Sequence, residues 1–93
     1  MTGQQRACLR KLAQRIEPVI YIGKEGITQG IVASAKEAIE ARELIKGSVQ
    51  QNAEVSAKEA CAALCEALDA QGISCIGRKF VLYKRSEQNI LGL

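Results

Sequence analysis

Short apolar segments typical of buried strands alternate along this chain with longer segments of helical periodicity. The clearest strand-like segment, VIYI, is β-branched and aromatic and lies between Pro18 and Gly23. The last two such segments are separated only by Gly77 and Arg78, which is typical of a tight hairpin. Glycine at position 47 weakens the second segment. Strands are therefore expected at residues 19–22, 43–49, 73–76 and 79–84.

Three segments have the spacing of amphipathic helices. The first runs from Gln4 to Ile16 and ends before Pro18, because proline disfavours helical geometry in the residue that precedes it. The second begins after Thr28, whose hydroxyl can accept a backbone N–H at a helix start. The third opens with the capping box Ser56–Glu59 and is expected to end at Gly72.

The expected order of elements is α-β-α-β-α-β-β. Strand–helix–strand units pair in parallel through right-handed crossovers, and the final hairpin adds one antiparallel strand. A chain of 93 residues can bury one core. The sequence therefore predicts a single α/β domain over residues 1–93, a two-layer fold with helices on a mixed four-stranded sheet. Alternating polar positions in 43–49 indicate that part of the second sheet face is open to water.

Composition narrows the possible functions. The chain is 47% hydrophobic and 25% charged, has no apolar run long enough for a membrane span and contains no histidine. Its N-terminus lacks the apolar centre of a secretory signal, so we expect a cytoplasmic location. The lack of histidine removes the commonest general base and excludes Ser-His-Asp chemistry. We expect no enzyme activity, no cofactor and no small-molecule substrate.

The four cysteines, at positions 8, 61, 65 and 75, include no CxxC pair. Cys61 and Cys65 would share one helix face, but no second pair completes a metal site, so no metal is expected. The favoured interpretation is that all four are buried, reduced, apolar side chains. An enzyme with a cysteine nucleophile is the alternative, and Cys75, near a basic hairpin, would be its candidate.

Charge is distributed unevenly along the chain. The net charge is +3, yet residues 1–24 alone hold five cations and one acid, a net charge of +4. Residues 25–45 hold two cations and four acids, a net charge of −2. Residues 76–86 hold four cations and no acid. This asymmetry indicates one basic face suited to a polyanion.

The loop between the first strand and the second helix is the most specific candidate site. Gly23 and Gly26 permit positive φ and expose backbone N–H groups that no Cβ shields. The N–H groups of the helix start that follows favour an anion, and Lys24 adds a mobile positive charge. These features suit a phosphate, as in the GxxG loop of KH domains. A plain turn is the alternative, and Glu25 is unfavourable for an anion.

Four pieces of sequence occur together in one order: 12–28 (LAQRIEPVIYIGKEGIT), 40–49 (EARELIKGSV), the capped third helix and 73–85 (ISCIGRKFVLYKR). Together they resemble the CRM domain (chloroplast RNA splicing and ribosome maturation) in its stand-alone bacterial YhbY-like form. The resemblance implies a fold similar to the C-terminal domain of bacterial translation initiation factor three. It also implies RNA as the partner and, for stand-alone members, association with precursors of the large ribosomal subunit. We therefore expect a monomeric ribosome assembly factor that binds large-subunit (pre-50S) rRNA.

The resemblance assigns the backbone clamp to Gly23, Lys24, Glu25 and Gly26, with Thr28 capping the helix behind them. Cations outside the loop are further candidates for RNA contact, and each has solvated surface as its alternative. These candidates are Lys46, Arg78, Lys79, Lys84, Arg85 and, on the first helix, Arg6, Arg10, Lys11 and Arg15.

The only aromatic residues are Tyr21, Phe80 and Tyr83, and all three are expected in the core. Recognition should then rest on the RNA backbone and shape, with little base readout. Two other interpretations stay open: a protein-interaction module of the same fold, and a protein that binds non-ribosomal RNA.

Overall fold

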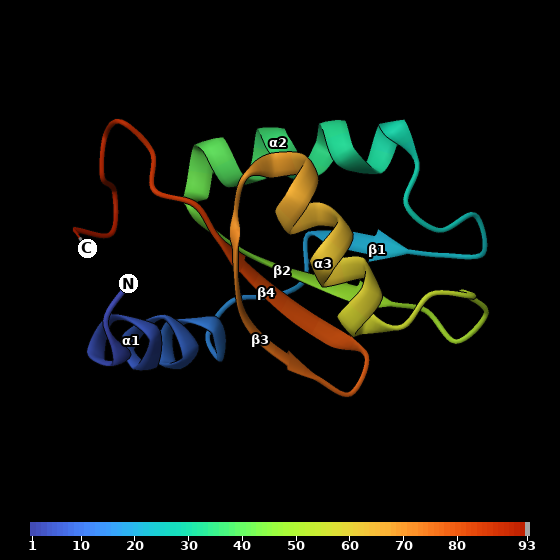
Figure 1. Ribbon diagram of the computed structural model, residues 1–93, viewed down its shortest axis with the longest axis horizontal. Coiled ribbons are helices and arrows are strands. Elements are labelled where there is room, and N and C mark those ends of the chain that lie inside the picture. The colour runs from blue at the N-terminus through green and yellow to red at the C-terminus, as the bar shows by residue number, and fades with distance from the viewer. Residues whose placement is uncertain (93) are drawn as a thin grey trace.

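The computed structural model describes residues 1–92, and its elements follow the predicted order (Figure 1). The helices are α1 (Gly3–Ala13), α2 (Gln29–Arg42) and α3 (Ala57–Leu68). The strands are β1 (Ile20–Ile22), β2 (Leu44–Val49), β3 (Gln71–Ile76) and β4 (Lys79–Tyr83). No helix within residues 1–92 is long and apolar enough to cross a membrane.

The strands form one mixed sheet in the order β1-β2-β4-β3, which confirms the predicted four-stranded sheet. β1 and β2 are parallel and joined by the crossover through α2. β4 is antiparallel to both of its neighbours. β4 lies between β2 and β3. The crossover through α3 therefore joins two strands, β2 and β3, that are parallel but not adjacent in the sheet.

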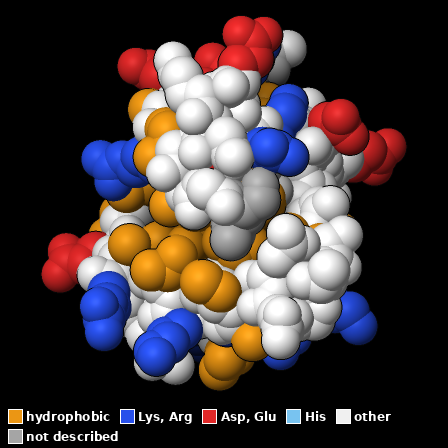
Figure 2. Space-filling model, turned by 90° about the vertical axis from the view of Figure 1, so that its left-hand side faces the viewer, with side chains coloured by type: hydrophobic (Ala, Val, Ile, Leu, Met, Phe, Trp, Pro, Cys, Tyr) orange, Lys and Arg blue, Asp and Glu red, His pale blue; other side chains and the backbone are white. Residues whose placement is uncertain are grey.

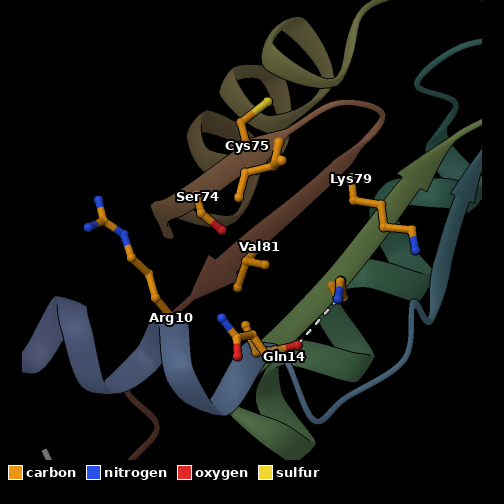
Figure 3. Close-up of a pocket in the computed structure, with 9 residues that line it drawn as sticks. Arg10, Gln14, Ser74, Cys75, Lys79 and Val81 are labelled. Atoms are coloured by element: carbon orange, nitrogen blue, oxygen red, sulfur yellow. Dashed lines mark hydrogen bonds between the residues drawn. The ribbon is translucent and has the colours of Figure 1, made fainter.

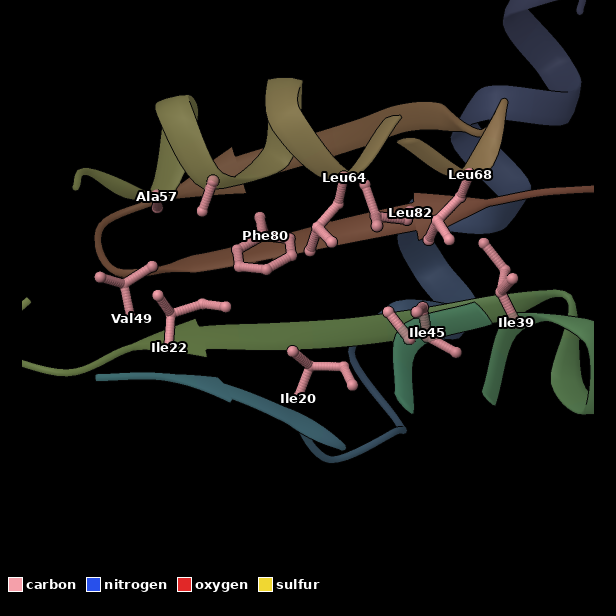
Figure 4. Packing of buried hydrophobic residues seen from close by; sticks show 12 residues of the cluster. Ile20, Ile22, Ile39, Ile45, Val49, Ala57, Leu64, Leu68, Phe80 and Leu82 are labelled. Carbon is pink, nitrogen blue, oxygen red and sulfur yellow. The ribbon is translucent and has the colours of Figure 1, made fainter. Parts of the chain in front are cut away.

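α2 and α3 cover one face of the sheet and enclose the main core (Figures 1 and 4). Leu64 of α3 and Ile39 of α2 are both almost fully buried there. The ring of Phe80 lies between α3 and β2, on its partner Gly47. A Cβ at Gly47 would lie only 2.2 Å from Phe80 Cζ, so the glycine that weakens β2 as a strand makes room for the aromatic ring.

α1 packs on the opposite face and covers only one half of it. Leu9 and Ala13 of α1 contact a second core cluster that includes Leu44, Val81 and Tyr83. The expected two layers are thus the sheet and the α2–α3 layer, and α1 adds a partial third layer. The other half of this face is open to water, as the polar alternation in β2 predicted.

Two helix ends differ from the prediction. α1 ends at Ala13, and a turn leads from there toward Pro18. α3 ends at Leu68, where Asp69 adopts the left-handed conformation with φ 55°, one that Asp tolerates better than most residues. The expected stop at Gly72 was wrong, because Gly72 belongs to β3. A Cβ there would lie 3.1 Å from Cys61 Sγ, so the glycine allows α3 to pack close to β3.

Two expectations about burial were also wrong. Cys8 and Cys75 are exposed and the other two cysteines are half-buried, although all four are free thiols. Tyr21 is 55% exposed, while Phe80 and Tyr83 are buried as expected.

Glu43, between α2 and β2, is fully buried and holds the C-terminal segment in place. Its carboxylate accepts the Leu91 N–H at 2.9 Å, the Ser86 N–H at 2.7 Å and the Ser86 hydroxyl. Burial alone would raise the pKa of Glu43. The hydrogen bonds from Ser86 and from the backbone at 90–91 outweigh it and lower the pKa to about 2.

Candidate nucleic-acid interface

The GxxG loop is a tight turn with an exposed tip. The Gly26 N–H donates to the Gly23 carbonyl at 3.0 Å, and Gly26 has a φ of 71°, a conformation that favours glycine. Lys24 and Glu25 form the tip and are exposed. A shallow hollow of about 270 Å³ lies between this turn, Thr28 and Ile31.

The start of α2 lies directly behind the turn. Thr28 caps the helix, and its Oγ1 accepts the Ile31 N–H at 3.2 Å. The first N–H groups of a helix have no intrahelical partner, so those of Gln29 and Gly30, both exposed residues, are free of helical hydrogen bonds. The first turn of α2 carries no acidic residue that would offset the partial positive charge of the helix start, and the one acid among the described residues of the hollow is Glu25 at the tip of the turn. An anion against this turn would therefore meet backbone donors and a positive helix end.

The hairpin turn between β3 and β4 lies at the same end of the sheet. The Gln50 N–H donates to the Ile22 carbonyl at 2.8 Å, and the Val49 N–H donates to the Arg78 carbonyl at 2.7 Å. The end of β2 therefore lies between the two turns, as the right-hand side of Figure 1 shows. The fold thus brings Arg78 and Lys79 to the same end as the GxxG turn, and both are exposed.

A groove of about 610 Å³ separates α1 from the open half of the sheet (Figure 3). Ser74 and Val81 lie on its floor, Arg10 extends from α1 on one side, and Lys79 lies on β4 on the other. Lys46 is the third cation of the groove, and its Nζ donates to the Ala13 carbonyl at 3.3 Å, the contact drawn dashed in Figure 3. The end of α1 fixes this lysine in the groove.

Several predicted cations bind the protein's own backbone. Arg6 Nη1 donates to the Gly72 carbonyl at 2.8 Å, and Arg10 Nε donates to the Ile73 carbonyl at 3.4 Å, so both tie α1 to β3. Lys84 Nζ donates to the Leu68 carbonyl at 2.9 Å, at the end of α3 and far from the GxxG turn. These three side chains, like Lys46, have structural partners that the sequence did not reveal.

The remaining predicted cations do not gather at the turn. Lys11 and Arg15 lie exposed on or just after α1, and Arg85 follows β4 at the opposite end of the sheet. Figure 2 shows this opposite end. The charged side chains at the bottom of that view, on the side of α1, are Lys and Arg, whereas the upper half, on the side of α2, carries both acidic and basic side chains. This agrees with the uneven charge along the sequence.

Sequence reasoning missed the residues that line the open sheet face between the cations. Tyr21 and Ile76 are 55% and 78% exposed, and Ser48 lies in the same row of the sheet as Tyr21. The signal was present in the pattern of β1: Ile20 and Ile22 point into the core, so alternation places Tyr21 on the opposite face.

Two of the four cysteines, Cys61 and Cys65, lie together on α3 and have raised pKa values. Burial, together with the neighbouring Cys65, raises the pKa of Cys61 to about 12, and burial also raises the pKa of Cys65. Neither is a thiolate at neutral pH. Within residues 1–92, no cluster of three or more His, Cys, Asp or Glu side chains could hold a metal ion.

Comparison with known proteins gives a consistent set of relatives. The sequence matches the CRS1/YhbY (CRM) domain family over residues 1–84. The probable RNA-binding protein YqeI of Bacillus subtilis is 39% identical over 89 residues, which cover 96% of this chain and 93% of YqeI. A protein of Haemophilus influenzae named as an RNA-binding protein is 30% identical over 88 residues, which cover 95% of this chain and 89% of the relative.

A solved structure shares the fold. It is the solution structure of a hypothetical protein of Staphylococcus aureus, described as a candidate RNA-binding protein. The two chains are 38% identical with a TM-score of 0.80, and the match covers 96% of this chain and 93% of the other.

The fold and the site define a small α/β domain with an exposed, glycine-containing turn that carries Lys24 at one end of a mixed sheet. The chain belongs to the CRS1/YhbY (CRM) domain family, as the resemblance in sequence indicated.

Proposed function

We propose that this protein binds RNA without catalysing a reaction, and that it acts as a monomeric assembly factor on large-subunit (pre-50S) rRNA in the cytoplasm. One observation carries the proposal: the exposed Gly23–Gly26 turn, with Lys24 at its tip, lies against a helix start without acidic residues. Family membership and the names of the relatives support RNA as the ligand.

The turn suits the RNA backbone more than the bases. Its N–H groups and Lys24 offer hydrogen bonds and charge to a phosphate, and neither distinguishes one base from another. Arg78 and Lys79, at the same end, extend the positive surface across the sheet. Binding of this kind is governed by phosphate positions and RNA shape, which fits a folded ribosomal RNA.

Crosslinking of the tagged protein to RNA in growing cells, followed by sequencing, tests the ribosomal part of the proposal. We expect reads concentrated in large-subunit rRNA and the protein in the pre-50S fractions of a sucrose gradient. Lys24→Glu should remove both signals. Lys36→Glu is the matched control, because Lys36 is exposed on α2 about two turns beyond the helix start.

Two results would contradict the proposal. Reads from many unrelated RNAs, with no enrichment in large-subunit rRNA, would remove the ribosomal assignment and leave general RNA binding. Crosslinks that persist unchanged in Lys24→Glu would make the GxxG turn an ordinary connection between β1 and α2.

A further inference from the structure

One row of side chains crosses the open half of the sheet from edge to edge. Tyr21 of β1 pairs with Ser48 of β2, Ser48 pairs with Lys79 of β4, and Lys79 pairs with Ile76 of β3. Paired residues point to the same face, so these four side chains lie side by side on the face that α1 leaves open. Strands are about 4.8 Å apart, which places the ring of Tyr21 roughly 10 Å from the base of Lys79.

The row has an apolar side chain at each end, and the two side chains between them, Ser48 and Lys79, are polar. Tyr21 and Ile76 are apolar and exposed at the two ends, at 55% and 78%. The next row toward α1 pairs Lys46 with Val81 and Val81 with Ser74, and it forms the floor of the groove. The side chains lining this groove include Arg10, Lys46 and Lys79, and no Asp or Glu is among those that the structure describes. An aromatic ring beside a cationic groove without acids complements a ligand that carries both flat rings and phosphates.

We infer that this open sheet face binds an unpaired nucleotide of the RNA, with its base stacked on Tyr21 and its flanking phosphates held by Lys79 and Lys46. Tyr21 is two residues before Gly23, so β1 leads from the proposed stacking position directly into the GxxG turn. α1 forms a wall on one side of the face. The faces of a base inside a duplex are covered by the neighbouring bases, whereas a base splayed out of a loop or bulge can stack on an exposed ring.

The inference rests on RNA being the ligand, and it adds a requirement for a single-stranded segment at one position. The proposed function needs only phosphate contacts at the GxxG turn. The two claims therefore separate experimentally, because they depend on different residues, Lys24 for the turn and Tyr21 for the stack.

Tyrosine fluorescence gives a direct test. The chain has no tryptophan and two tyrosines, so Tyr83→Phe leaves Tyr21 as the only emitter. This background should fold well, because the Tyr83 hydroxyl is buried without a hydrogen-bond partner in the described residues. The probes are an unstructured eight-nucleotide RNA and the same sequence closed into a duplex. We expect the single strand to quench the emission at least twofold and the duplex to leave it nearly unchanged.

Affinities of three variants for the single strand complete the test. Tyr21→Leu keeps an apolar side chain without a ring and should weaken binding at least roughly fivefold. Tyr21→Phe keeps the ring and should restore most of the affinity. Lys24→Glu reports on the GxxG turn independently.

Each remaining outcome decides against the inference. If Lys24→Glu weakens binding and Tyr21→Leu does not, the proposed function stands and the stacking site is overturned. If the wild-type chain binds neither RNA, both are overturned. Capture of a protein partner that depends on Tyr21, with unchanged RNA affinity, would assign the face to that partner instead.

Discussion

Gly47 of β2 lies directly under the ring of Phe80 of β4, so closely that a methyl group at Gly47 would lie 2.2 Å from Phe80 Cζ. Phe80 is 1% exposed and packs between β2 and α3, so the ring has no free space into which to move. Because position 47 has no side chain, the ring of Phe80 can pack directly on β2, the strand that pairs in parallel with β1 and antiparallel with β4.

Gly47→Ala should therefore lower the free energy of unfolding by about 1–3 kcal/mol, the usual cost of overpacking a core. Urea unfolding followed by circular dichroism measures this. In the double variant Gly47→Ala, Phe80→Leu, the smaller side chain relieves the clash. The double variant should therefore lose less free energy of unfolding than the two single variants lose together. Additive effects would show that Gly47 is not required by Phe80.

Glu43 should make stability depend on pH in the acid range. Its pKa is lowered to about 2 from an ordinary value of 4.5, so its carboxylate stabilises the fold fully above about pH 4.5 and progressively less as the pH falls toward 2. Glu43→Gln places an amide donor against N–H donors and should cost about 1–3 kcal/mol at pH 7. Its unfolding midpoint should change less than that of the wild type between pH 5 and 3.

Glu40→Gln is the control for Glu43, because Glu40 is exposed on the last turn of α2, just before Glu43. It should match the wild type at every pH. Equal pH dependence in Glu43→Gln and the wild type would contradict the assigned role of the Glu43 carboxylate.

Two lysines of the C-terminal half should separate stability from RNA binding. Lys84 binds the Leu68 carbonyl at the end of α3, so Lys84→Met should cost about 1 kcal/mol of stability and change RNA affinity less than twofold. Lys79 faces the groove, so Lys79→Met should leave stability within about 0.5 kcal/mol and weaken RNA binding several-fold. Urea unfolding and fluorescence anisotropy measure the two effects. Equal changes in stability and in RNA affinity for the two variants would contradict the separate roles of Lys84 and Lys79.

RNA affinity should depend strongly on salt. Contacts from Lys24, Arg78, Lys79 and Lys46 would give a slope of log K against log salt of roughly −3, at about 0.7 per phosphate on single-stranded RNA. Lys24→Gln should reduce the slope by about 0.7 as well as the affinity. Affinity that is insensitive to salt would contradict a phosphate-based interface.

Local chemistry in the sequence was enough to predict the order of elements. Pro18, the capping box at Ser56 and the two-residue turn at Gly77 each restrict the backbone by themselves, and the structure keeps all three features. The end of α3 was not predictable in this way. Asp69 and Gly72 can each end a helix, and only the close packing of Cys61 on β3 decides that Gly72 belongs to the strand.

The turn at Gly23–Gly26 was identified from sequence, but the groove between α1 and the open sheet face was not. Which sheet face α1 covers, and how much of it, depends on packing between residues that are distant in sequence, such as Leu9 and Tyr83, which belong to one buried cluster. The exposure of Tyr21 and the backbone bonds of Arg6 and Lys84 follow from that placement. Counting cations along the chain could not separate those that hold the fold from those that face the groove.

The central claim is that the GxxG turn binds an RNA phosphate, and Gly26 offers the most direct test. A Cβ at Gly26 meets no atom within 4 Å, and its φ of 71° is tolerated by Asn and Asp. Gly26→Asn and Gly26→Asp therefore differ mainly in charge. Measured by fluorescence anisotropy on one RNA, Gly26→Asp should bind roughly tenfold more weakly than Gly26→Asn, a difference of about 1.4 kcal/mol. Equal affinities in the two variants would mean that no phosphate lies at the turn.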